Sequence, residues 1–588
     1  MKQFFKMMFA STLGMLVATG VLVLTGTFVL IGMAASISSR PAYTPPANTV
    51  FKLALNGSLA DNAEDNPFAV LLGETATQLS LKDILQSIRA AKNEPNIKGI
   101  YIESGAFSAG TASIDAVRRA LLDFKESGKF VVAYADNYMQ GGYYLSSVAD
   151  KVFLNPQGAV YLLGFASQTT FYKGILKKAG IEMQIFKVGT YKGYVEPFML
   201  DKLSDENREQ ITSYMNSIWG NICEGIAGAR KLSANEVNRF ADEGMSLSAA
   251  GNAVTYGLVD ELGYKIDVDA YVKELAGQTD DKLKTTGVDK LRNVKESIKK
   301  KADKIAVLYA EGSIMPQAAA SPYNSAPTIT ERMADELHKL YRDDEVKAVV
   351  LRVNSPGGSA FVSDQIWHEV ARMKEAKPLV VSMGDVAASG GYYISCAASR
   401  IIAERNTVTG SIGIFGMFPN ASGLYKMLDV TTDVVKTNHF GDIGSLARPM
   451  REDEKALIQS HIEQGYDTFL SRCAEGRGMT REEVDRIGQG RVWTGEQALE
   501  RGLVDELGGL DRAIEAAAEL SGTTDYSVTH VSGSKDFLTG LLEKQLDNLR
   551  LSIVKHMLGE EFEQVKKLHD IRSARGILAR MPYDIEPL

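Results

Sequence analysis

The chain has 588 residues, a formal net charge of −8 and a hydrophobic content of 45%. This length exceeds what a single hydrophobic core accommodates, so we expect several domains. The acidic balance argues against nucleic acid as the main partner, because proteins that bind it present clustered basic residues. The three cysteines are too few for a disulfide framework or a metal cluster, and Cys223 and Cys473 are expected to be buried on matching helices.

The N-terminal segment is strongly apolar. No charged residue interrupts Leu13–Ala35, which exceeds the roughly 20 residues needed to span a bilayer and is longer than the apolar region of a cleaved signal peptide. The small residues at its end also fit a cleavage site. Lys2 and Lys6 precede the run, so the positive-inside rule places the N-terminus in the cytoplasm. We therefore predict a single-pass anchor of the cytoplasmic (inner) membrane at 1–40, with the remaining chain on the periplasmic side.

The rest of the chain contains one domain twice. Gln140–Ser146 aligns with Ser389–Ser395, and Gly257–Gly263 recurs without change as Gly502–Gly508. A repeat of this length indicates a duplicated domain rather than a solenoid.

Polar and lysine-rich stretches divide the chain further. We predict a first copy at 49–278, a linker at 279–304, a second copy at 305–533 and a helical tail at 534–588. Within each copy, apolar strands alternate with amphipathic helices, which predicts an α/β fold with a largely parallel sheet. In the second copy the expected elements are strands at Ile305–Tyr309, Ala348–Val353, Pro378–Ser382 and Arg400–Ala403, with a helix at Ser363–Lys374.

Ser389 lies between a predicted strand and a predicted helix at Gly390–Ala398. N–H groups at a helix N-terminus stabilise an adjacent oxyanion, although a serine at this position is also a common helix N-cap. Asn354–Gly358 follows another strand, and its paired glycines can turn N–H groups into a pocket or form an ordinary turn. The first copy has Gln140 in place of the serine and Ser108–Ala109 in place of the glycines. This joint loss favours a catalytic interpretation of both segments.

A nucleophilic serine needs a base, and two residues are candidates. His439 follows Ser389 in the second copy, but a surface position is the commoner one for such a histidine. Lys192 lies among apolar and aromatic residues, and its place in the second copy is taken by Gly441. Burial depresses the pKa of a lysine so that it can act as a base, and Ser-Lys pairs are a known variant of serine catalysis.

These segments resemble those of a known family. The resemblance is to the long, duplicated, membrane-anchored form of the S49 serine proteases, the signal peptide peptidases. It is carried by Asn354–Gly358, Gly384–Tyr393, Thr409–Ile414, Tyr191–Lys192 and Glu196–Phe198.

The resemblance implies a crotonase/Clp-protease-like fold in each copy and no metal or cofactor. It implies Ser389 as nucleophile, Lys192 as general base and Ser411 as the hydroxyl that orients the lysine, with Gly358 and Gly390 as oxyanion donors. The implied substrates are signal peptides left in the membrane and other apolar peptides, and the implied assembly is a homotetramer.

Two other functions fit a duplicated α/β chain. A crotonase-like acyl-CoA enzyme uses the same fold and a similar oxyanion hole, but a domain outside the cytoplasm would not meet CoA. A non-enzymatic membrane scaffold would need neither Ser389 nor Lys192.

Overall fold

The computed structural model of the protein describes residues 43–62, 78–244, 248–294, 303–317, 327–531 and 576–581, with a few positions between 6 and 25. The predicted anchor at 1–40 and most of the predicted tail therefore lie outside the described residues. Within the described part of the chain, no helix has the length and apolar character needed to cross a bilayer.

The first copy is a three-layer α/β unit built on a parallel sheet of order β2-β1-β3-β4-β5-β7, with β8 paired to β1. Helices α3, α4 and α5 pack on one face, and α11 packs on the other. Burial on both faces explains why the strands are almost continuously apolar. The strands are β1 (Thr49–Ala60), β2 (Gln78–Ser80), β3 (Ile97–Ser108), β4 (Phe130–Ala135), β5 (Lys151–Leu154), β7 (Glu261–Leu262) and β8 (Thr285–Thr286). The helices are α3 (Leu81–Asn93), α4 (Thr111–Lys125), α5 (Gln140–Ser146), α9 (Ala234–Asp242), α10 (Ala250–Thr255), α11 (Lys265–Leu275) and α12 (Val288–Leu291).

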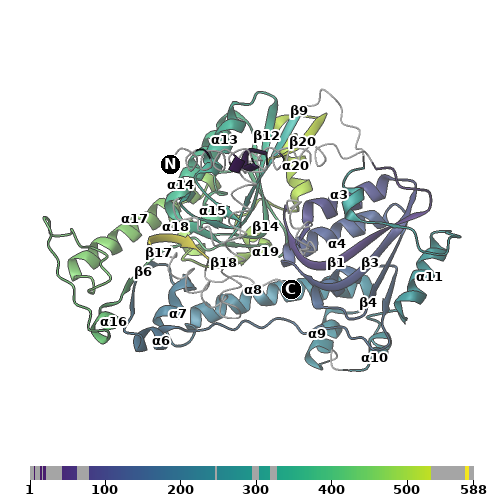
Figure 1. Cartoon of the computed structure of the whole chain (residues 1–588), viewed down its shortest axis with the longest axis horizontal. Coiled ribbons are helices and arrows are strands. Elements are labelled where there is room, and N and C mark those ends of the chain that lie inside the picture. The colour runs from purple at the N-terminus through teal and green to yellow at the C-terminus, as the bar shows by residue number, and fades with distance from the viewer. Residues whose placement is uncertain are drawn as a thin grey trace.

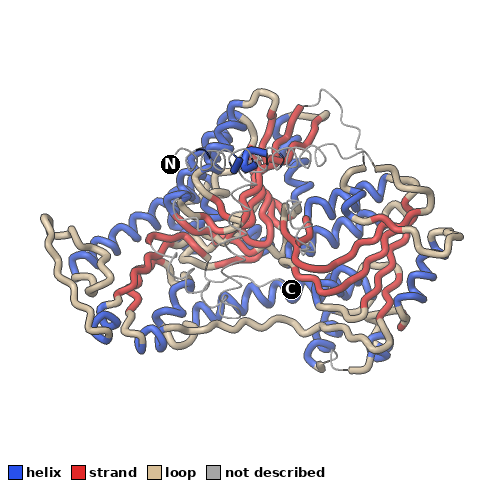
Figure 2. Tube along the Cα trace, viewed as in Figure 1, coloured by secondary structure: helices blue, strands red, loops and turns tan. Residues whose placement is uncertain are grey.

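The second copy repeats this plan with a sheet of order β18-β16-β14-β12-β9-β20, to which β15 and β19 are added (Figure 2). All its strand pairs are parallel except β16 with β18. The strands are β9 (Asp303–Glu311), β12 (Val346–Ser355), β14 (Leu379–Ala388), β15 (Arg400–Ala403), β16 (Val408–Gly410), β18 (Val492–Thr494), β19 (Glu506–Leu507) and β20 (Tyr526–Val531). The helices are α13 (Arg332–Arg342), α14 (Ala360–Ala376), α15 (Gly390–Tyr393), α17 (Glu452–Arg477), α18 (Arg481–Ile487), α19 (Gly495–Glu500) and α20 (Leu510–Ser521).

The strands predicted in the second copy are confirmed, and the helix predicted at Ser363–Lys374 lies within α14. Its expected apolar face is buried, with Ile366, Val370 and Met373 inaccessible to solvent. Spacings of three and four residues place these side chains on one side of the helix, above the sheet.

The motif that recurs without change has a structural reason. Asp260 accepts the N–H of Val152 at 2.7 Å and pairs with Arg230, and its counterpart Asp505 does the same with Ile401 and Arg477. Each aspartate thus ties a short strand to the long helix of its own copy. Cys223 and Cys473 lie buried as free thiols on these two long helices, α8 (Asp205–Arg230) and α17, as expected.

Part of the expected linker belongs to the first copy. Thr285–Thr286 forms β8 beside β1, and Leu291 of α12 is fully buried in the first core. Residues 285–291 are therefore part of the first domain and not of a linker. The segment is polar in composition, but its apolar residue Leu291 packs into the first core.

A third sheet joins three distant parts of the chain in the order β11-β10-β13-β21-β17-β6. From the first copy comes β6 (Glu182–Val188), which runs antiparallel to β17 (Ile414–Asn420). The other strands are β10 (Ser313–Ile314), β11 (Thr328–Ile329), β13 (Gly357–Ser359) and β21 (Gly576–Arg580). The expected helical tail is wrong at Gly576–Arg580, because pairing with β13 and β17 decides the conformation of this short apolar run.

The first copy reaches the second through an arm. Residues 156–204 leave the first sheet, include β6 and return through α8, which runs along the lower side of the molecule in Figure 1. The arm contains α6 (Lys173–Lys178), the 3₁₀ turn η1 (Gly193–Val195) and α7 (Glu196–Met199), and it ends where α8 (Asp205–Arg230) begins. It lies beside α16 (Ser422–Met427) of the second copy.

A buried ion pair and a hydrogen-bonded pair also hold the copies together. Arg352 on β12 donates to both carboxylate oxygens of Asp61 at 2.8 and 3.2 Å, and both residues are almost inaccessible. Asp385 on β14 accepts from the N–H and the hydroxyl of Ser113 at 2.8 and 2.7 Å. β12 leads directly to the Gly357–Gly358 segment and β14 leads directly to Ser389. Contacts from the first copy therefore stabilise the strands that carry the second copy's site.

Candidate active site

Ser389 follows the last residue of β14 and is fully buried. Its φ of 56° and ψ of −113° lie outside the usual regions for a non-glycine residue, and its N–H donates to the carbonyl of Gly410 at 2.8 Å. The side chain makes no capping bond, so Ser389 is not an N-cap of the ordinary kind. The helix expected at Gly390–Ala398 is correct only for its first turn, since α15 ends at Tyr393. A residue in a rarely populated backbone conformation at a strand end is typical of catalytic positions.

Lys192 lies directly against this serine. Its Nζ is 2.8 Å from Ser389 Oγ, 3.0 Å from the carbonyl oxygen of Ser411 and 3.1 Å from Ser411 Oγ. The side chain is fully buried, and this burial lowers the pKa of Lys192 well below its usual range. The structure thus brings together three residues singled out from the sequence, within a single chain.

Ser411 is held by the loop that follows β16. Its φ is 52°, and its N–H donates to the carbonyl of Arg491 at 2.6 Å. This fixed backbone presents both Ser411 oxygens to the lysine amine. With Ser389, they give the amine three oxygen neighbours in a site closed to solvent.

The loop that carries Lys192 is docked on the second copy. Tyr191 donates its N–H to the carbonyl of Gln489 at 2.8 Å. Gln210 of α8 bridges the copies, because it donates to the carbonyl of Tyr191 at 2.8 Å and accepts the N–H of Val492 at 3.1 Å. Gly490 allows the close approach, since a Cβ there would lie 2.7 Å from the Cβ of Lys192.

Glu196 fixes the turn after Lys192 through contacts within the first copy. Its buried carboxylate accepts from the N–H and the hydroxyl of Ser204 at 3.1 and 2.5 Å, and from Asn207 at 3.0 Å. Sequence reasoning noted Glu196 only as part of a motif and missed Gln210 and Gly490. The Gly488–Gly490 stretch carried a turn signal, whereas nothing in the local sequence distinguishes Gln210.

Of the two expected oxyanion residues, Gly390 directly follows Ser389, and Gly358 directly follows Gly357, which approaches Gly390. A Cβ built on Gly357, whose φ is 92°, would lie 2.5 Å from the backbone nitrogen of Gly390, so this approach requires glycine. Gly357 donates its own N–H to Ser355 Oγ at 3.1 Å. Gly358 follows it in β13, between Ile314 of β10 and the tail strand β21.

The first copy shows what replaced the serine. Gln140 Oε1 accepts the N–H groups of Leu163 and Gly164 at 3.0 and 2.9 Å, and Nε2 donates to the carbonyl of Gly164 at 3.3 Å. The glutamine therefore anchors the chain where the arm to Lys192 begins. Gln140, which aligns with Ser389, therefore has a structural role in the first copy: it holds the start of the arm.

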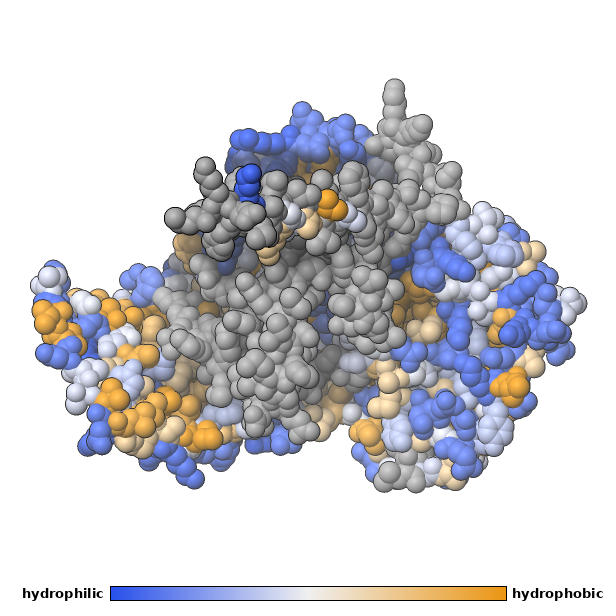
Figure 3. All heavy atoms as spheres, viewed as in Figure 1, coloured by the Kyte–Doolittle hydropathy of each residue, from blue (hydrophilic) through white to orange (hydrophobic). Residues whose placement is uncertain are grey.

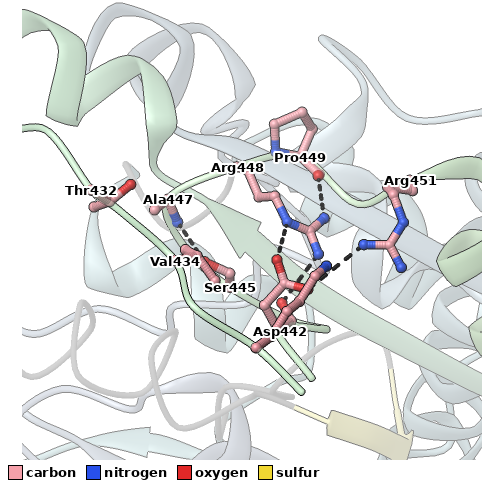
Figure 4. Close-up of a pocket in the computed structure, with 9 residues that line it drawn as sticks. Thr432, Val434, Asp442, Ser445, Ala447, Arg448, Pro449 and Arg451 are labelled. Atoms are coloured by element: carbon pink, nitrogen blue, oxygen red, sulfur yellow. Dashed lines mark hydrogen bonds and ion pairs between the residues drawn. The ribbon is translucent and has the colours of Figure 1, made fainter. Parts of the chain in front are cut away.

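The alternative base, His439, lies in a different setting. It is 62% exposed and forms a hydrogen bond with Asp453, near a cavity of about 570 Å³ shown in Figure 4. Arg448 and Lys436 hold the pKa of Asp442 in this cavity well below its usual range. The hydrogen bonds of Lys192 go to Ser389 and Ser411, neither of which lines this cavity. The cavity is lined by Thr432, Val434, Lys436, Asp442, Ser445, Ala447, Arg448, Pro449 and Arg451.

Comparison with known proteins places this chain in a family. The family model of peptidase family S49 matches residues 123–279 and 371–524, and the Clp protease model matches residues 279–408. Protease 4 of Salmonella typhi is 37% identical over 497 residues, covering 82% of this chain and 79% of that protein. The chloroplastic serine protease SPPA of Arabidopsis thaliana is 29% identical, covering 91% and 77%. The putative signal peptide peptidase SppA of Enterococcus faecium is 34% identical, covering 42% and 71%.

The two S49 segments cover the later part of each α/β unit, from the end of α4 to α11 in the first copy and from α14 to α20 in the second. The Clp protease match covers the first strands and helices of the second unit. The duplication, the fold and the extent of the similarity to Protease 4 agree with one another. The chain belongs to peptidase family S49 and is a serine protease with a duplicated Clp-protease-like α/β fold.

Proposed function

We propose that this serine protease cleaves peptides with a Ser389–Lys192 dyad completed across its two copies. The observation that carries the proposal is the 2.8 Å contact between Lys192 Nζ and Ser389 Oγ in a fully buried position. Burial lowers the pKa of this amine and so favours its neutral form, which is the form that accepts a proton.

The geometry supports the following sequence of steps. Lys192 takes the proton of Ser389 Oγ as this oxygen attacks the peptide carbonyl, and the resulting ammonium then protonates the departing amine. Ser411 holds the amine toward Ser389 through its two oxygens. The N–H groups of Gly358 and Gly390 stabilise the oxyanion. Lys192 next activates the water that hydrolyses the acyl-enzyme.

A fluorophosphonate probe tests this assignment, because it phosphonylates only an activated serine. After long incubation with excess probe, we expect mass spectrometry to find the label on Ser389 and to find none in the Ser389→Ala variant. A folded wild-type protein that stays unlabelled would support a scaffold or an acyl-CoA enzyme instead. Labelling of another serine would also refute the dyad.

We further propose that the substrates are residual signal peptides and other apolar peptides. The support is the family resemblance and the name of the Enterococcus faecium relative, a putative signal peptide peptidase. An anchor at 1–40 would hold the site close to such peptides on the periplasmic side of the membrane. Protease added to spheroplasts is expected to digest the protein to a small anchor fragment. Full protection until the cells are lysed would reverse this topology.

Assembly as a homotetramer remains a proposal from the family resemblance. Exposed apolar side chains gather where α6 and α16 lie, at the end of the molecule seen at lower left in Figure 3. They come from both copies and include Ile175, Met427, Leu428, Val434 and Val435. A surface of this kind is suited to contact with another subunit.

A further inference from the structure

Residues 489–492 of the second copy form a brace between the two loops of the candidate site. The carbonyl of Gln489 accepts the N–H of Tyr191, the residue before the candidate base, at 2.8 Å. The carbonyl of Arg491 accepts the N–H of Ser411 at 2.6 Å. The same short segment therefore sets where the base loop lies relative to the loop that orients the amine.

Gln210 on α8 fastens the base loop to this brace. Its side-chain nitrogen donates to the carbonyl of Tyr191 at 2.8 Å, and its side-chain oxygen accepts the N–H of Val492 at 3.1 Å. The side chain is inaccessible to solvent. Tyr191 is thus held at both of its main-chain groups, the N–H by the brace and the carbonyl by Gln210. The backbone from which the Lys192 side chain extends is therefore fixed on the second copy.

A side-chain amide is suited to this connection. Tyr191 offers an acceptor and Val492 offers a donor, so the group between them must donate with one atom and accept with another. The Gln210 amide also donates to Asn207 Oδ1 at 2.6 Å, and Asn207 donates in turn to Glu196 at 3.0 Å. These contacts fix the orientation of the amide, because exchanging its oxygen and nitrogen would set like groups against each other.

We propose that Gln210 is a positioning residue for the reaction, one that sets the separation between the Lys192 amine and the Ser389 hydroxyl. This inference rests on the proposed function and adds to it a residue that acts through the main chain. Gln210 joins the base loop to the segment that already holds Ser411. Without this link the backbone at Lys192 is free to move relative to the serine. A displacement of about 1 Å at a catalytic group costs about a hundredfold in rate.

Asn221 provides a matched control on the same helix. It lies about three turns beyond Gln210 on α8, so both residues are on one face of the helix. Its buried amide also crosses to the second copy, where it donates to Asn406 Oδ1 at 2.8 Å. Both amides hold the copies together, and Gln210 is the one that bonds to the base loop.

The test compares Gln210→Met with Asn221→Leu in the full chain, since each change keeps the bulk of the side chain and removes its hydrogen bonds. Gln210→Met is expected to lower kcat about a hundredfold. KM should be nearly unchanged, because a buried side chain does not meet the substrate. The rate of fluorophosphonate labelling of Ser389 should fall by a similar factor. Asn221→Leu is expected to lower the thermal midpoint while kcat and the labelling rate stay at their wild-type values.

The pH–rate profile distinguishes positioning from general stability. A loosened base loop lets water reach Lys192, so the pKa of its amine rises toward the ordinary value. The ascending limb of the profile should therefore move to higher pH in Gln210→Met and stay in place in Asn221→Leu.

Gln210→Glu tests the same link while keeping the contact to Val492. Its carboxylate still accepts that N–H but no longer donates to Tyr191, so kcat should fall here as well. This variant also decides the question if Gln210→Met does not fold.

Two results would overturn the inference. One is a wild-type kcat and an unmoved limb in a folded Gln210 variant. The other is an equal loss of kcat in Gln210→Met and Asn221→Leu with the limb unmoved, which would show that general docking of the copies matters and not the placement of the base. A Ser389 that is unreactive in the wild-type protein would instead refute the proposed function itself.

Discussion

Ser389→Ala and Lys192→Ala are each expected to lower kcat for peptide hydrolysis by about 10⁴-fold while the fold is kept. The two residues act as a unit, so the double variant should be no slower than either single variant. Lys192→Arg should be equally inactive, because a guanidinium stays protonated and cannot serve as a base. Steady-state kinetics with circular dichroism of each variant measures both effects.

The matched control is His439→Ala. This histidine is exposed and contacts Asp453, so its loss is expected to leave kcat unchanged. The dyad would be wrong if Lys192→Ala kept substantial activity while His439→Ala lost it. That outcome would assign the base to the histidine, which the sequence had left as the alternative.

Activity is expected to rise with pH through the ionisation of Lys192, well below the ordinary lysine value of about 10.4. Burial lowers the pKa of Lys192, so the amine is neutral above the lowered value and protonated below it. Only the neutral amine accepts the serine proton, and kcat/KM should therefore fall about tenfold for each pH unit below that pKa. A pH–rate profile over a broad range measures the ionisation.

A half-buried carboxyl whose pKa is raised toward neutrality supplies the control. Burial raises the pKa of Glu311 to about 7. Glu311→Gln should leave the ascending limb of the profile in place if Lys192 causes it. If that variant removes the limb, or if activity appears only near an ordinary lysine pKa, the idea of a buried neutral base is wrong.

The same shift links pH to stability. An unfolded Lys192 has an ordinary pKa, so between the two values the unfolded state binds more protons than the folded state. The free energy of unfolding contributed by this residue therefore increases with pH in that window and decreases as pH falls through the folded pKa. Lys192→Met should remove this part of the pH dependence in denaturant titrations.

The sequence by itself determined the duplication, the α/β class and the residues of interest. These features could be read because they are local or repeated. Strand and helix periodicities are set within about ten residues, and the two copies could be compared position by position. Ser389 and Lys192 were singled out because each copy has lost what the other keeps, at Gln140 and Gly441. Their catalytic roles stay predictions, although the structure places them in contact.

Only the tertiary structure decided how the site is assembled. The pairing of β6 with β17 carries Lys192 to the second copy, and Gln210 and Glu196 fix its loop through contacts far apart in the sequence. The tail strand shows most clearly what the local sequence cannot predict. Gly576–Arg580 is a short apolar run that fits a helix or a strand equally well by periodicity. Its conformation is set by two neighbouring strands that lie more than a hundred residues away in the chain, and no local pattern encodes such a pairing.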